Sequence, residues 1–132
     1  MIQRCIDLPT GFLCVPADQV LAQAAATGAT PDDSPGVEMS PAGGLCSFET
    51  IFAKYRLDDP ALARLATIVR DADTSRLDLA PQSAGLYAIS LGLSRLMADD
   101  HAMLQHGLVR YDALCAWCRE GQAETHHWPP AA

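Results

Sequence analysis

The side chain best suited to chemistry is a histidine at the start of the last predicted helix. His101 follows Asp99 and Asp100, and a carboxylate beside an imidazole can fix its tautomer and strengthen it as a metal ligand or base. Helical spacing puts His101 in register with Leu104 and Leu108, so we expect it to face the core. The alternative is a half-buried histidine whose aspartate neighbours only cap the helix.

A mixed metal site is the first hypothesis for this chemistry. Carboxylate and thiol side chains around a long loop and at the end of the preceding helix could join the histidine. The candidate ligands are Glu38, Cys46, Glu49, Asp73, Asp100 and His101. An oxygen-rich site with one imidazole suits iron, manganese or zinc. The chain has no H-x-E, H-E-x-x-H or paired C-x-x-C pattern, so this hypothesis depends on the fold rather than on a motif.

Arginines near the same helix end raise a second hypothesis, an oxyanion site. Arg70 and Arg76 flank Asp71 and Asp73, whose carboxylates at a helix C-terminus oppose the macrodipole at about 0.3–1 kcal/mol each. An arginine, a loop amide or a metal must offset that cost, and we expect arginine pairing. A dianion would instead need several arginines to converge. The candidates are Arg4, Arg70, Arg76 and Arg95.

A third chemical option is a thiol pair, Cys115 and Cys118, in a C-x-x-C spacing. A redox dithiol usually places its first cysteine at a helix N-terminus, where the dipole lowers the thiol pKa. Both cysteines instead fall near the end of a long predicted helix, on its apolar side. We therefore expect them to pack in the core as small apolar side chains.

The elements that must position these residues are mainly helical. The predicted helices are Ala17–Thr27, Cys46–Tyr55, Pro60–Asp73, Ser83–Ala98 and Asp99–Gly121. A minor two-stranded β ribbon near the N-terminus would pair Gly11–Val15 with Val37–Met39. The helix from residue 83 is the most apolar, and we expect it to be deeply buried. Its small residues form a groove that another helix could approach, within the domain or in a homodimer; they are Gly85, Ala88 and Gly92.

Size and charge bound the remaining possibilities. The chain has 132 residues and a net charge of −7, which predicts one domain over residues 1–132, with a Pro/Gly-rich loop at 29–45 and a tail at 121–132. The acidic balance argues against nucleic-acid binding and against an anionic membrane surface. The odd number of cysteines, 5, and the absence of a signal-peptide pattern favour a reducing cytoplasm.

A family resemblance rests on a series of segments in order. They include Asp58–Thr74, Arg76–Gln82, Leu91–Arg95, Asp99–Leu104, Tyr111–Leu114, Trp117–Arg119 and Glu124–His126, extended by Val15–Asp18, Gly28–Thr30, Pro35–Glu38 and Cys46–Phe48. Together they resemble the C-terminal domain of the chromate resistance protein ChrB family. Members often begin with a basic, cysteine-containing segment that this sequence lacks. They also often carry a histidine where this chain has Ser40–Gly43.

The resemblance implies a role in bacterial chromate resistance. We expect an accessory or sensor domain that binds a metal ion or a chromate-like oxyanion near the start of the last helix. The overall negative charge favours a cation. Two alternatives stay open: a small redox enzyme that uses a metal or a thiol, and a helical interaction module without a ligand.

Overall fold

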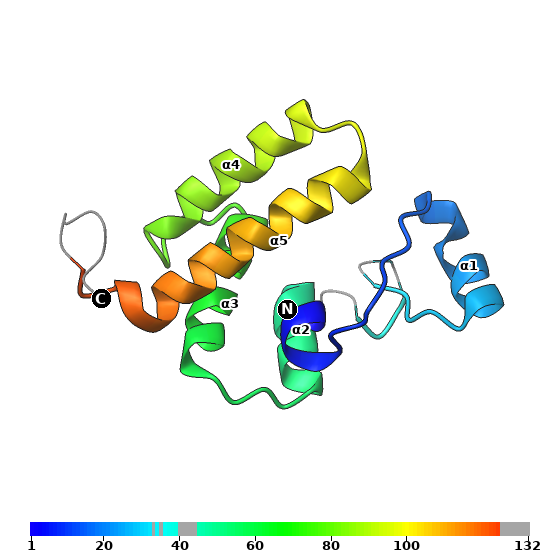
Figure 1. Cartoon of the computed structure of the whole chain (residues 1–132), viewed down its shortest axis with the longest axis horizontal. Helices are drawn as coiled ribbons and strands as arrows, with labels where there is room; N and C mark the ends of the chain where they lie inside the picture. Colours follow the sequence, from blue (N-terminus) through cyan, green and yellow to red (C-terminus); the bar gives the residue numbers. More distant parts are fainter. Residues whose placement is uncertain (33, 35, 40–44, 125–132) are drawn as a thin grey trace.

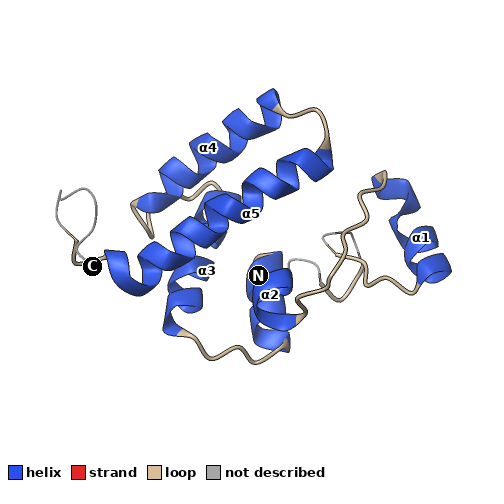
Figure 2. Ribbon diagram, in the orientation of Figure 1, coloured by secondary structure: helices blue, strands red, loops and turns tan. Residues whose placement is uncertain are grey.

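The computed structural model describes residues 1–32, 34, 36–39 and 45–124, and this part of the chain is mainly helical (Figures 1 and 2). Five α-helices follow one another: α1 (Val20–Thr27), α2 (Ser47–Lys54), α3 (Pro60–Asp73), α4 (Gln82–Leu96) and α5 (Asp100–Ala116). Short helical turns precede or extend them; these are η1 (Ile2–Ile6), η2 (Ala17–Gln19) and η3 (Trp117–Gly121). The predicted helices are confirmed to within a few residues at each end.

The predicted two-stranded ribbon is wrong for the described residues. Gly11–Val15 has no regular secondary structure, and the second segment takes part only in an isolated parallel bridge between Asp32 and Met39. Two short strands make a ribbon that is marginal in water without further strands to support it. The described part of the N-terminal third therefore consists of α1, the turns η1 and η2, and irregular segments.

Helix α3 is the centre of the core. Asp59 caps it, because its Oδ1 accepts hydrogen bonds from the amides of Ala61 at 2.8 Å and Leu62 at 3.4 Å, and Pro60 occupies the first turn. The predicted apolar stripe of α3 is buried, with side chains of α2, α4, α5 and η3 around it. The buried cluster comprises Ala61, Leu62, Leu65, Ile68, Ala72, Ala80, Leu86 and Cys118.

A buried aspartate fixes the connection between α3 and α4. The Asp71 side chain has no exposed surface, and its Oδ2 accepts hydrogen bonds from the amides of Leu79 and Ala80, both at 3.0 Å. Burial raises the pKa of this carboxyl, but the loop hydrogen bonds outweigh burial and hold the pKa below its ordinary value. Arginine pairing was the wrong expectation for Asp71, because hydrogen bonds from loop amides stabilise its charge instead.

Helix α4 lies at the edge of the bundle, so the expectation that it is deeply buried is wrong. Only Ser83 and Leu86 are buried on it, while Ile89 is 56% exposed and Leu96 78% exposed. A Cβ atom built on Gly85 or Gly92 would meet nothing within 4 Å. The small-residue groove is therefore not used for packing inside the described part of the domain.

Helix α1 stands apart from the other helices (Figure 1). It has no buried residue, and no other α-helix in the described part of the chain is in contact with it. Gly28 ends it with φ of 73°, the left-handed conformation that favours glycine at this position. Residues 1–32 thus form an arm, and an ion pair of 2.7 Å between Arg4 and Asp112 joins its first turn to α5.

None of the helices in the described ranges combines the length and the apolar character that a bilayer span requires.

Candidate functional site

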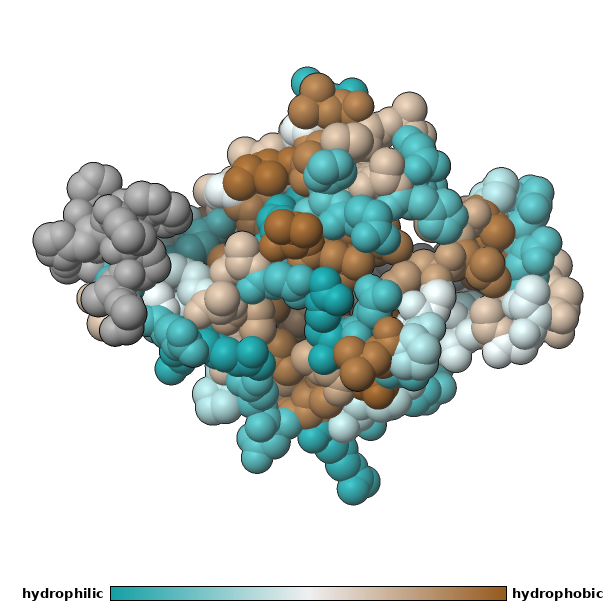
Figure 3. All heavy atoms as spheres, in the orientation of Figure 1, coloured by the Kyte–Doolittle hydropathy of each residue, from teal (hydrophilic) through white to brown (hydrophobic). Residues whose placement is uncertain are grey.

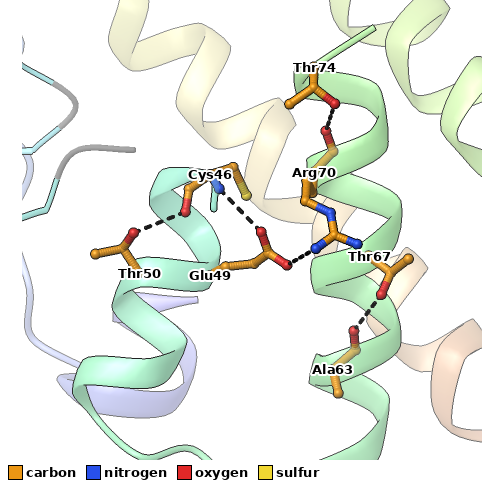
Figure 4. A network of polar contacts seen from close by, with 7 residues as sticks. All are labelled: Cys46, Glu49, Thr50, Ala63, Thr67, Arg70 and Thr74. Atoms are coloured by element: carbon orange, nitrogen blue, oxygen red, sulfur yellow. Dashed lines mark hydrogen bonds and ion pairs between the residues drawn. The ribbon is translucent and has the colours of Figure 1, made fainter. Parts of the chain in front are cut away.

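Several predicted site residues take part in a network of polar contacts at the junction of α2 and α3 (Figure 4). Cys46 precedes α2 and is 3% exposed. Its amide donates to Glu49 Oε2 at 3.2 Å, and its side chain accepts from the Glu49 amide, which completes a capping box. The other Glu49 oxygen, Oε1, accepts from Arg70 Nη1 at 2.9 Å. Glu49 therefore links the start of α2 to the middle of the core helix.

The Cys46 thiol is held in its neutral form. Burial raises its pKa, and the charges of Glu49 and Asp73 raise it further, against hydrogen bonds from the first amides of α2 that lower it. A helix N-terminus often activates a cysteine. Here desolvation outweighs the hydrogen bonds that would lower the pKa, and the sulfur takes part in the capping box.

The predicted metal ligands are dispersed. Asp73 lies at the exposed end of α3 and lines a cavity of about 220 Å³ with Tyr87, Ser90 and Tyr111. Glu38 points to Lys54, whose Nζ lies 2.8 Å from Glu38 Oε2. In the described ranges, no three His, Cys, Asp or Glu side chains are arranged to hold a metal ion. Ser40–Gly43, the position where the resemblance implies a histidine, lies outside those ranges.

The start of α5 does not place its histidine as expected. Asp99 caps the helix, with its Oδ2 accepting from the Ala102 amide at 2.7 Å, but His101 and Asp100 are both exposed. The loop end of the α4–α5 hairpin extends away from α3 (Figure 1). His101 is therefore in register with the apolar stripe of α5 but has no core beside it.

The arginines do not converge on an anion site within the described chain. Arg70 is engaged by Glu49, Arg4 by Asp112, and Arg76 lies 3.8 Å from Asp78. Arg95 is on the exposed last turn of α4. A carboxylate already neutralises most of these guanidinium groups, so the arrangement provides no ready clamp for a dianion.

The family model for the C-terminal domain of ChrB matches residues 1–118 of the chain. The chain belongs to the ChrB C-terminal domain family. This membership agrees with the resemblance of the helical segments and associates the chain with chromate resistance. Searches of the curated proteins and of the solved structures gave no match.

Cys115 and Cys118, the C-x-x-C pair of this ChrB domain, lie at the end of α5 and in the turn η3 that continues it. Cys118 is fully buried in the core cluster, and Cys115 packs against that cluster. Burial raises the pKa of both thiols. Their packing agrees with the expectation of core cysteines, and their raised pKa values count against a reactive dithiol.

We expect alkylation by iodoacetamide at neutral pH to separate the cysteines into two classes. Cys5 and Cys14 are exposed, so they should react first. Cys46 and Cys118, buried and with raised pKa values, should react at least about tenfold more slowly. Mass spectrometry of peptides over a time course measures each rate, with urea-unfolded protein as the control for intrinsic reactivity. Equal rates in the folded protein would contradict the burial of the capping thiol.

Sequence reasoning missed Glu49 as the centre of the junction, although it named the residue. The signal was present as Cys46-x-x-Glu49, which has the spacing of a capping box with cysteine in the place of serine. It also missed a larger cavity between the N-terminal arm and the bundle, because no local pattern predicts which loops enclose a space.

Proposed function

We propose that this ChrB-family domain serves chromate resistance as an accessory domain that acts by association, through the outer face of α4. We define this face by Gly85, Ala88, Ile89, Gly92 and Leu96, which recur at helical spacing. The observation that carries the proposal is the exposure of Ile89 and Leu96, 56% and 78%, beside glycines with open space over them. Figure 3 has apolar surface along the edge where Figure 1 places α4.

The partner that fits this face is a second copy of the chain. Small residues let two helix backbones approach closely, and large apolar neighbours then bury surface on both sides. In an antiparallel pair related by a two-fold axis, the end of one α4 lies beside the start of the other.

Self-association is tested by sedimentation velocity over a range of concentrations. Wild-type protein is expected to dimerise, and Ile89→Glu should weaken the dimer at least about tenfold by burying an unpaired charge at its centre. Val109→Glu is the matched control, because Val109 is 68% exposed on α5, outside the proposed face. A wild-type chain that stays monomeric at millimolar concentration, or equal effects of the two variants, would reject the proposal.

A second candidate is the ligand-binding role expected from the sequence, with the junction of Cys46, Glu49, Arg70 and Asp73 as its place. What favours it is that the Glu49 carboxylate, at 14% side-chain exposure, joins the Cys46 amide at the start of α2 to the Arg70 guanidinium of α3. A metal ion would have to take the place of Arg70 as the partner of Glu49. An oxyanion would have to approach Arg70 against the charges of Glu49 and Asp73, so a cation is the better match.

Elemental analysis of purified, untagged protein distinguishes the two candidates. About one equivalent of iron, manganese or zinc per chain, lost in Glu49→Gln and in Asp73→Ala but kept in Glu38→Gln, would support a metal-binding sensor. Protein without stoichiometric metal, and without heat of binding on titration with chromate, would reject the ligand role and leave association alone.

A further inference from the structure

A cavity of about 630 Å³ lies between the N-terminal arm and the rest of the domain. Most of its lining is apolar, and it includes residues from both sides. Its apolar lining residues include Ile6, Phe12, Val15, Val20, Met39 and Tyr55. This volume and lining fall in the range of ligand-binding cavities in proteins, and neither ChrB family membership nor the α4 face accounts for it.

One wall of the cavity is a segment with the sequence of a β-strand but without a strand partner. Gly11–Val15 reads Gly-Phe-Leu-Cys-Val, and no backbone hydrogen bond joins these residues to another described part of the chain. Leu13 is 62% exposed. An apolar segment with unpaired amides and carbonyls is a template on which an extended peptide can add as a strand.

The charged side chains among the described residues that line the cavity all have the same sign. They are Asp7, Asp32 and Asp100, and none of these described lining residues is a lysine, arginine or histidine. Thr10 donates a hydrogen bond of 2.6 Å to Asp7, which leaves the charge of that carboxylate in place. An occupant with a positive charge is therefore favoured over a neutral or acidic one.

We propose that this cavity binds an extended, apolar peptide segment that carries a lysine or arginine, contributed by a partner protein. The peptide pairs with the backbone of Gly11–Val15, places apolar side chains beside Phe12 and Val20, and directs its basic side chain to the carboxylates. The unpaired backbone favours a peptide over a small amphiphile, because only a peptide satisfies a row of amides and carbonyls. Occupation would also give α1, an eight-residue helix, the packing that helices of this length need for stability.

Selection from displayed random eight-residue peptides tests the proposal on the full chain. Selected peptides are expected to share apolar residues with at least one lysine or arginine. A synthetic copy of the strongest should bind at least about tenfold more tightly than the same peptide with glutamate in place of its basic residue. No enrichment, or enrichment of acidic peptides, would overturn the proposal.

Two variants locate the bound peptide. Cys14→Pro removes an amide from the pairing segment, and Val20→Trp fills the cavity, so each should weaken binding of the selected peptide at least about tenfold. Leu8→Ser is the matched control, since Leu8 is an exposed residue of the same arm, 76% exposed, outside the cavity lining. Circular dichroism shows whether each variant is folded, and undiminished binding to either folded variant would overturn the proposal.

Discussion

Replacing Asp71 with alanine is expected to lower the midpoint of thermal unfolding by about 10 °C. The carboxylate has no exposed surface and accepts the amides of Leu79 and Ala80 at 3.0 Å. Alanine leaves both amides without a partner inside the protein, and the connection between α3 and α4 loses the group that holds it. Differential scanning calorimetry at neutral pH measures the change. A decrease of only one or two degrees would show that water satisfies the loop as well as the carboxylate does.

Asp71→Asn separates the hydrogen bonds from the charge. An asparagine oxygen in place of Oδ2 can accept from the same two amides, so this variant should lose less stability than Asp71→Ala. The folded-state pKa of Asp71 is below its ordinary value, so its charge stabilises the fold above the unfolded pKa, about 3.9. That stabilisation is lost as pH falls through the folded pKa. The difference in unfolding midpoint between wild type and Asp71→Asn should therefore be largest near neutral pH and shrink below about pH 4.

Local signals predicted the core helix because its start and its stripe depend on nearby residues. Asp59 and Pro60 mark the beginning of α3, and Leu62, Leu65 and Ile68 are buried as their spacing predicts. The environment of α4 could not be predicted in this way. Its apolar residues are as frequent as those of a central helix, but burial depends on neighbours far away in the sequence, and α4 has them on one side only.

The sequence allowed the residues of the candidate site to be predicted, but not which of them lie together in the fold. The pattern named Cys46, Glu49, Arg70 and Asp73, and the fold brings the first three into one network. His101 was expected beside them because helical register was taken as burial. Register fixes the direction of a side chain relative to its own helix. Whether another element lies beside that side chain depends on the fold, and the start of α5 extends away from α3 (Figure 1).

Removal of the Glu49 carboxylate is expected to be the most damaging change at the α2–α3 junction. Glu49→Ala should lower the free energy of unfolding by about 2–3 kcal/mol, because it removes the capping box of α2 and leaves Arg70 half-buried without its partner. Arg70→Met should cost less, about 1 kcal/mol, since Glu49 then keeps its bond to the Cys46 amide. Urea unfolding followed by circular dichroism measures both changes in free energy. Glu38→Ala is the control: it removes the ion pair of Lys54 with Glu38, whose side chain is 75% exposed, and should produce no measurable change.

The double variant makes the prediction specific to the ion pair. If Glu49 and Arg70 stabilise each other directly, the combined loss should be smaller than the sum of the single losses by about 1 kcal/mol or more. Additive losses would mean that Glu49 acts only as a cap. The same variants also test whether a metal ion binds at this junction, because one oxygen of Glu49 cannot bind both Arg70 and a metal ion. In Arg70→Met, a metal that binds at this junction has no ion pair of Glu49 to break. Zinc should therefore raise the unfolding midpoint of Arg70→Met more than that of the wild type. Equal shifts of the two midpoints would place any metal elsewhere.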